Sequence, residues 1–179
     1  MNSAITITIM KNKYLFTLIL AMLTSSLFAQ NNEDFAGMWE NSKQYTLGVV
    51  KAMPDNLLDY KPDGKFRTFR EEAEHIINNL HFLTFNYLTE KGGAPKYDAS
   101  RKSKEEILEK LAASFDMVTA VFEQFVADDL KKEVKFFTGD LFKKQRILYL
   151  LKDHTTHHRA KMIIYLRLND IAPPSYVGW

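Results

Sequence analysis

The chain has 179 residues, of which 46% are hydrophobic and 26% charged, and it contains no cysteine. This length predicts one domain with a substantial core, and the composition is that of an ordinary soluble globular protein. The 24 basic residues nearly balance the 22 acidic ones and are scattered along the chain. This argues against a nucleic-acid-binding protein, because such proteins concentrate basic residues on one face. The absence of cysteine excludes disulfides, thiolate metal ligands, a cysteine nucleophile and lipid attachment through cysteine.

Residues 10–30 have the order of features found in a secretory signal peptide. Two lysines precede an apolar run of about 15 residues, and small residues ending in Ala29 follow it. The run is shorter than the roughly 20 apolar residues of a membrane-spanning helix, although an uncleaved anchor helix is the alternative. We therefore predict a signal peptide over residues 1–29, translated from Met1 or Met10. The product is expected to be exported, periplasmic or secreted, with no stable membrane span after signal removal.

Two helices are predicted in the first half of the remaining chain. The first runs from about Asp34 to Met53, where large apolar residues recur at helical spacing and a proline follows. A loop rich in turn residues, "PDNLLDYKPDGKF", separates it from the second helix. That helix opens with "TFRE", in which Thr68 and Glu71 are spaced as in a capping box, and it extends to about Glu90.

Two further helices are predicted towards the carboxyl end. The third opens with "SKEE", a second capping box, and runs to about Val126. Residues 128–140 are a connector in which "EVKFFTGD" can form a short extended segment. The last helix runs from about Leu141 to Asn169 without proline or glycine. Four amphipathic helices without a clear strand pattern predict an all-α fold, a four-helix bundle over residues 30–179.

The last predicted helix carries three of the five histidines, in the run "HTTHH". Because successive helical residues turn by about 100°, His158 lies about 40° from His154 on the same face, whereas His157 lies about 60° away. Two imidazoles four residues apart commonly offer two ligands to one divalent ion. A surface patch or hydrogen-bonded core histidines are the alternatives. The natural pair of ligands is therefore His154 and His158.

A third ligand is available on the second predicted helix. His75 lies in the first half of that helix, and ligands from facing helices of a bundle converge on its core. His81 lies about 120° around the helix from His75, so that both cannot face one ion.

The early histidine of the second helix, the run "DHTTHHRAK" and the ending "LRLNDIAPPSYVGW" together resemble the DinB superfamily of four-helix-bundle proteins. The resemblance covers roughly Asp34 to Trp179. It implies an up-down-down-up bundle that binds a divalent metal through His75, His154 and His158.

Lys161 is where the chain departs from the family pattern. The family motif usually continues as histidine, arginine, glycine and glutamine, whereas this chain has His158, Arg159, Ala160 and Lys161. A lysine there repels the ion, extends to water at the rim of the pocket, or positions an anionic substrate.

Three neutral nitrogen ligands leave an open coordination position, which is typical of a catalytic metal site. Zinc suits this ligand set best, and nickel or iron also fits. The expected function is that of an exported metal-dependent enzyme acting on a small molecule, either a hydrolase or a thiol-transferase-type enzyme. Thiol-dependent transferases occur among the relatives that the resemblance implies, but export argues against thiol transfer because small-molecule thiols are mainly cytoplasmic.

No catalytic residue is identified, because Asp153 and Glu74, which adjoin the ligands, are not clearly placed as a general base. Four residues are candidates for contact with the ligands or the pocket: Asn79, His157, Lys161 and Trp39. The alternative function is a non-catalytic, metal-stabilised protein that binds a small ligand or acts in envelope stress. The sequence is also compatible with a homodimer.

Overall fold

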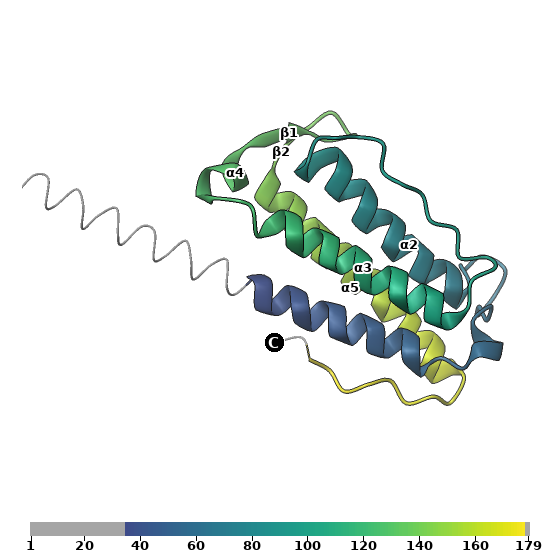
Figure 1. Ribbon diagram of the computed structural model, residues 1–179. Coiled ribbons are helices and arrows are strands. Elements are labelled where there is room, and N and C mark those ends of the chain that lie inside the picture. The colour runs from purple at the N-terminus through teal and green to yellow at the C-terminus, as the bar shows by residue number, and fades with distance from the viewer. Residues whose placement is uncertain (1–34, 178–179) are drawn as a thin grey trace, which may run out of the picture. The chain divides into compact units, whose positions relative to one another are not determined.

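The computed structural model describes residues 35–177, and the predicted signal peptide lies outside this part of the chain. The described residues are mostly helical, and from Met38 onward they form one compact unit. None of the helices in this range is long and apolar enough to cross a bilayer. The four longest helices lie side by side (Figure 1); they are a helix over residues 35–52, α2 (Phe69–Leu83), α3 (Lys104–Phe122) and α5 (Lys144–Leu168).

Both predicted capping boxes are present, and they fix where α2 and α3 begin. The Thr68 hydroxyl accepts a hydrogen bond from the Glu71 backbone N–H at 3.1 Å, and the Glu71 carboxylate accepts one from the Thr68 N–H at 2.7 Å. Ser103 and Glu106 make the same pair of bonds at 3.2 and 2.9 Å at the start of α3. An N-cap of this kind contributes about 1 kcal/mol to helix stability. The phase of α2, and hence the direction of its side chains, is therefore set locally.

The helix α2 does not continue regularly to Glu90, as the sequence predicted. After Leu83 it widens into a π-helical turn, η2 (Thr84–Leu88), and Glu90 then adopts a positive φ of 58°. Lys144, the buried first residue of α5, donates from its ammonium to the Leu88 carbonyl at 2.7 Å.

At the opposite end of α2, the Tyr165 hydroxyl of α5 donates to the Arg67 carbonyl at 3.1 Å. The start of α5 therefore contacts the end of η2, and the end of α5 contacts the start of α2. It follows that α2 and α5 run antiparallel.

The connector between α3 and α5 differs from the prediction. The helix α3 ends at Phe122, about four residues early, and is followed by α4 (Ala127–Lys131). Two short strands then pair antiparallel, β1 (Glu133–Lys135) and β2 (Leu141–Lys143), so the expected extended segment is one half of a hairpin and α5 begins three residues later than predicted. The stacked rings of Phe136 and Phe142, 4.7 Å apart, support this hairpin.

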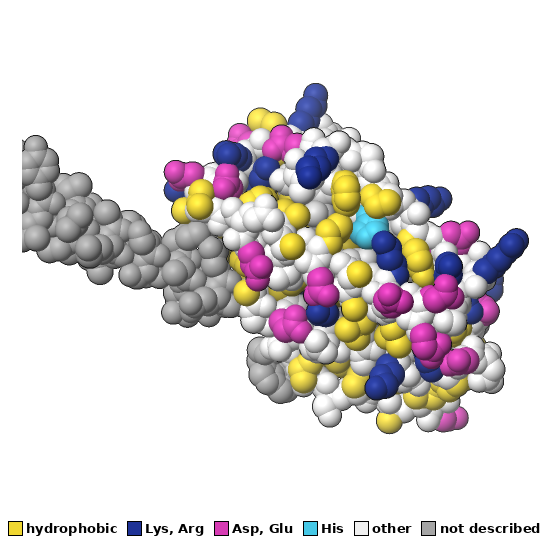
Figure 2. Space-filling model, in the orientation of Figure 1, with side chains coloured by type: hydrophobic (Ala, Val, Ile, Leu, Met, Phe, Trp, Pro, Cys, Tyr) yellow, Lys and Arg dark blue, Asp and Glu magenta, His cyan; other side chains and the backbone are white. Residues whose placement is uncertain are grey.

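The core contains the apolar faces of these helices. Trp39, which the sequence proposed for the pocket, lies within this core with 2% of its surface exposed, and its ring lies 4.9 Å from that of Phe115. Charged side chains of both signs are scattered over the face shown in Figure 2. Fully buried members from the three labelled long helices include Phe69, Ile76, Ile77, Leu80, Ile107, Leu111, Phe115, Val118, Ile147, Leu151, Met162 and Leu166.

Candidate metal centre

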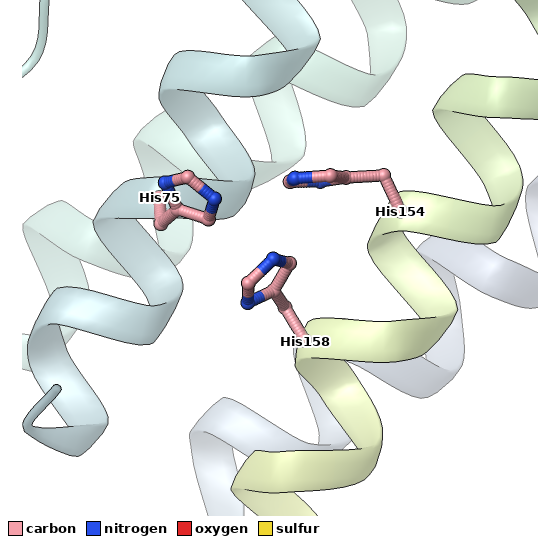
Figure 3. Close-up of side chains that lie close together, drawn as sticks. All are labelled: His75, His154 and His158. Atoms are coloured by element: carbon pink, nitrogen blue, oxygen red, sulfur yellow. The ribbon is translucent and has the colours of Figure 1, made fainter. Parts of the chain in front are cut away.

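The antiparallel pairing of α2 and α5 brings three histidines together midway along both helices. His75 comes from α2, and His154 and His158 come from successive turns of α5 (Figure 3). One ring nitrogen of each lies within 4.8 Å of the others. The ring centroids are 4.9 Å apart for His75 and His154, 4.3 Å for His75 and His158, and 4.4 Å for the pair on α5. The three residues selected by helix spacing thus form one cluster.

The donor set of this cluster fits a divalent metal ion. Burial, with smaller effects from neighbouring charges, lowers the pKa of His75 to about 4 and that of His154 to about 3. Both rings are therefore neutral at pH 7, which is the form that binds metals. The Nδ1 atom of His154 is also buried without a hydrogen-bond partner among the described residues. Since such groups in native proteins usually contact a water or an ion, this nitrogen favours a bound species at the cluster.

Glu72 is a buried residue of α2 that contacts the cluster, and the sequence did not identify it. Its carboxylate accepts a hydrogen bond from His158 Nδ1 at 2.5 Å, and only 1% of the residue is exposed. Burial alone would raise the pKa of Glu72, but the hydrogen bond and charge of His158, with help from Lys161, lower it. A carboxylate on one ring nitrogen leaves the other for a metal and increases the basicity of the ligand. In the sequence, its position three residues before His75 is the signal that could have identified Glu72 as a neighbour of the site.

Lys161 lies beside this carboxylate and not deep in the cluster. Its Nζ is 4.0 Å from Glu72 Oε1, and 31% of its side chain is exposed. Its charge is one of the smaller causes of the lowered pKa of His75. The lysine therefore lies at the edge of the candidate centre.

The other predicted candidates are spread over different environments. Asn79, one turn after His75, has a buried Oδ1 without a hydrogen-bond partner among the described residues. His157 is exposed and meets the His158 ring edge-on at 4.9 Å. Asp153 is exposed. Glu74, also considered as a base, accepts from the Ala99 backbone N–H at 2.9 Å.

His81 lies apart from the three-histidine cluster, as the helix geometry predicted. Its Nδ1 donates to the Pro95 carbonyl at 3.1 Å, and its Nε2 lies 3.0 Å from the Ser114 hydroxyl. Asn78 likewise exchanges two hydrogen bonds with Tyr97, at 2.9 and 2.7 Å. These contacts attach the segment around Pro95 to α2.

A cleft of about 1020 Å³ adjoins the cluster and includes His75 in its lining. Its walls come from residues 61–67, from α2, from residues 94–96 and from Lys161 of α5. A small molecule in this cleft can therefore reach a histidine of the cluster. Trp39, Asn79 and His157 do not line it.

Comparison with known proteins places this arrangement in a family. Residues 38–162 match the DinB superfamily. The uncharacterized protein YjoA of Bacillus subtilis strain 168 is 24% identical over 111 residues, which are 60% of this chain and 71% of YjoA.

Two crystal structures of DinB-like proteins share the fold. That of a Bacillus cereus ATCC 10987 protein has a TM-score of 0.65 at 20% identity and covers 81% of this chain and 97% of its own. That of Bacillus subtilis YjoA has a TM-score of 0.66 at 16% identity and covers 80% of this chain and 96% of its own. Because the family match extends over well more than half of the sequence, this chain belongs to the DinB superfamily.

Proposed function

We propose that the chain binds one divalent metal ion through His75, His154 and His158, with zinc as the preferred ion and nickel or iron as the alternatives. The convergence of three nitrogen atoms within 4.8 Å supports this proposal. The low pKa values of His75 and His154 support it as well, since no proton has to leave these rings at pH 7. When bound, such an ion supplies Lewis acidity that lowers the pKa of a water or a thiol.

The residues around the cluster would hold and orient the ligands. In the neutral form of His158, the hydrogen bond from Nδ1 to the Glu72 carboxylate would leave the ring lone pair on Nε2, the other ring nitrogen. His154 is half-buried beside His75, with the ring centroids 4.9 Å apart, and both rings stay neutral at pH 7. No residue of the cluster is a thiolate or an unpaired carboxylate. An ion held here would keep most of its positive charge for a substrate.

The single observation that carries a catalytic role is the opening of the cluster into the 1020 Å³ cleft through His75. Structural zinc sites are closed by four protein ligands, whereas catalytic sites keep a position for water or substrate. The function that this geometry supports best is metal-dependent chemistry on a small molecule, either hydrolysis or transfer to a thiol. A non-catalytic metal-stabilised binding protein remains the second candidate.

The metal and the activity are tested together. The purified chain should hold about one divalent ion, as measured by elemental analysis, and His154→Ala should lose tight binding while His157→Ala keeps it, because His157 points to solvent. Turnover of an ester, amide or thiol-conjugate panel should then require the ion and be absent in His154→Ala.

Unchanged metal content in His154→Ala would contradict the site. Metal binding that raises thermal stability without turnover on any substrate would favour the non-catalytic candidate. Turnover that needs an added thiol would select transfer over hydrolysis.

We also propose that the protein is exported after removal of residues 1–29 and that its bundle has the up-down-down-up order. The order of charged, apolar and small residues in that segment supports export. The antiparallel pairing of α2 and α5, inferred from the contacts at their two ends, is compatible with this topology.

A further inference from the structure

The cleft beside the cluster has an uneven distribution of charge. Its lining holds five basic residues and three acidic ones, an excess of two positive charges. The basic residues are Lys61, Lys65, Arg67, Lys96 and Lys161, and the acidic ones are Glu71, Glu72 and Glu74.

The three carboxylates already have partners within the protein. Glu71 closes the capping box of α2, with the Thr68 N–H at 2.7 Å, and Glu74 accepts from the Ala99 N–H at 2.9 Å. Glu72 accepts from His158 at 2.5 Å. These bonds hold the carboxylates against the protein, which leaves the cations as the groups with hydrogen-bond donors to offer a ligand.

The cations of the cleft are less engaged. Among residues 35–177, no ion pair within 4.0 Å involves the other four basic residues of the cleft, which are Lys61, Lys65, Arg67 and Lys96. Lys161 itself is 4.0 Å from Glu72, which is too far for a hydrogen bond. Its three N–H donors are therefore not used by that carboxylate.

Arg67 and Lys161 are the two cations that border the histidine cluster. Both line the same cleft as His75, and the Lys161 ammonium lies 4.0 Å from Glu72 Oε1 at the edge of the cluster. The backbone of Arg67 is fixed by the hydrogen bond from Tyr165, a residue of which only 2% is exposed. Lys161 projects from α5, one turn beyond His158. The two cations thus come from different elements and meet the same cleft.

The cleft also has apolar surface. Phe66 and Phe82 line it and are 47% and 38% exposed. Large aromatic side chains with that exposure offer stacking and hydrophobic contact to a ligand. The lining therefore combines a positive edge near the cluster with two aromatic rings.

We propose that the cleft selects amphipathic small molecules that carry a carboxylate or phosphate, with Arg67 and Lys161 binding the anionic group and Phe66 and Phe82 contacting the apolar part. Which part of such a molecule reacts depends on the proposed metal-dependent function. Binding of its anionic group by Arg67 and Lys161 does not depend on that function. Arginine forms paired hydrogen bonds to both kinds of anion, and lysine adds a point charge. Lys161 acts as a specificity residue and not as a metal ligand.

The test uses the full-length metal-free protein with hexyl phosphate as the probe and neutral hexanamide as its comparison. Metal-free protein removes direct coordination of the anion, so that binding reports the cleft alone. Isothermal titration or NMR shift titration should show hexyl phosphate binding that weakens with salt. Lys161→Gln and Arg67→Gln should each weaken it about threefold, the effect of a solvent-exposed ion pair. The double variant should weaken it roughly tenfold if the two residues act independently.

Lys131→Gln is the matched control, because Lys131 is exposed and lies outside the cleft. It should bind hexyl phosphate like the unmodified chain, and Lys161→Arg should do so as well because it keeps the charge. Three results would each overturn the inference. Hexyl phosphate does not bind, it binds no better than hexanamide, or the double variant binds it as well as the unmodified chain does.

A zinc titration of the same proteins separates this inference from the proposed function. If the protein binds zinc but not hexyl phosphate, the metal site stands and only the cleft assignment is overturned. Anion binding in a chain that does not hold zinc supports the cleft assignment and contradicts the metal site.

Discussion

The carboxylate of Glu72 is buried against a histidine ring, and this single contact governs how the cluster can use its nitrogen atoms. Glu72 has only 1% of its surface exposed, and its carboxylate lies 2.5 Å from His158 Nδ1. A buried carboxylate is stable only when a donor or a charge compensates its lost hydration. His158 supplies the donor, and the same bond favours the tautomer of His158 that the proposed metal binding through Nε2 would need.

Glu72→Gln should lower zinc affinity about 10- to 100-fold, the range found when a hydrogen-bond partner of a metal ligand is lost. The amide keeps the size of the carboxylate but lacks the negative charge that increases the basicity of the imidazole. Competition with a chromophoric chelator measures the affinity. Glu71→Gln is the matched control, since glutamine can replace glutamate in a capping box. Equal zinc affinity in the two variants would mean that Glu72 does not support the metal ligand.

The helices α2 and α5 place ionisable groups from distant parts of the sequence in one interface. His75 from α2 packs against His154 from α5, and partial burial of both rings lowers their pKa values, so that protonation of either is unfavourable in the folded protein. The consequence is a pH dependence of the pairing of these two helices in the metal-free protein.

The metal-free protein should lose stability as the pH falls from about 6.5 towards 4. The pKa of His75 is about 4 and that of His154 about 3 when folded, against 6.5 for a histidine in its ordinary state. Between these values the unfolded chain binds protons that the folded chain does not, so acid favours unfolding. Urea denaturation at pH 7 and pH 5 measures the effect, and His154→Ala should reduce the difference. The same free energy of unfolding at both pH values would contradict the burial of neutral histidines.

The extent to which the sequence predicts these elements follows from how local their interactions are. The starts of α2 and α3 were predicted correctly because Thr68 and Ser103 bond residues only three positions away. The pair His154 and His158 was visible for the same reason, since both lie on one face of one helix. The hairpin was missed because strands of three residues are too short to show a clear period and because it rests on a contact between Phe136 and Phe142.

Glu72 illustrates the limit for the candidate site. Its partner His158 lies 86 residues away in the chain, and helical spacing cannot show which side chain of one helix meets another. The cleft was missed for the same reason, because its walls come from three segments and one residue of α5. The prediction of a mostly helical DinB-superfamily protein is confirmed, because amphipathic periodicity recurs in each long helix and the family match covers residues 38–162.

At the scale of the whole molecule, the cellular location depends on residues outside the described part. Protein recovered from the cell envelope should begin at or near Gln30, because the apolar run is long enough for a signal peptide and short for a membrane span. Amino-terminal sequencing measures this directly. A variant with Lys11 and Lys13 changed to glutamate is the control, and it should accumulate with an intact amino terminus. An unmodified chain found in the cytosol starting at Met1 or Met10 would contradict export.

The position of the three histidines has one more consequence, which concerns the unfolded chain. A metal that joins His75 to His154 would close a loop of 79 residues, since 154 − 75 = 79. By the chain-entropy relation for cross-links, closing a loop of this length removes conformational freedom worth about 4.5 kcal/mol at 25 °C from the unfolded ensemble. A chain without cysteine has no disulfide to provide this restraint. The proposed ion would thus do for this protein what a disulfide does for many exported ones, and chelation would reverse it without any change of redox state.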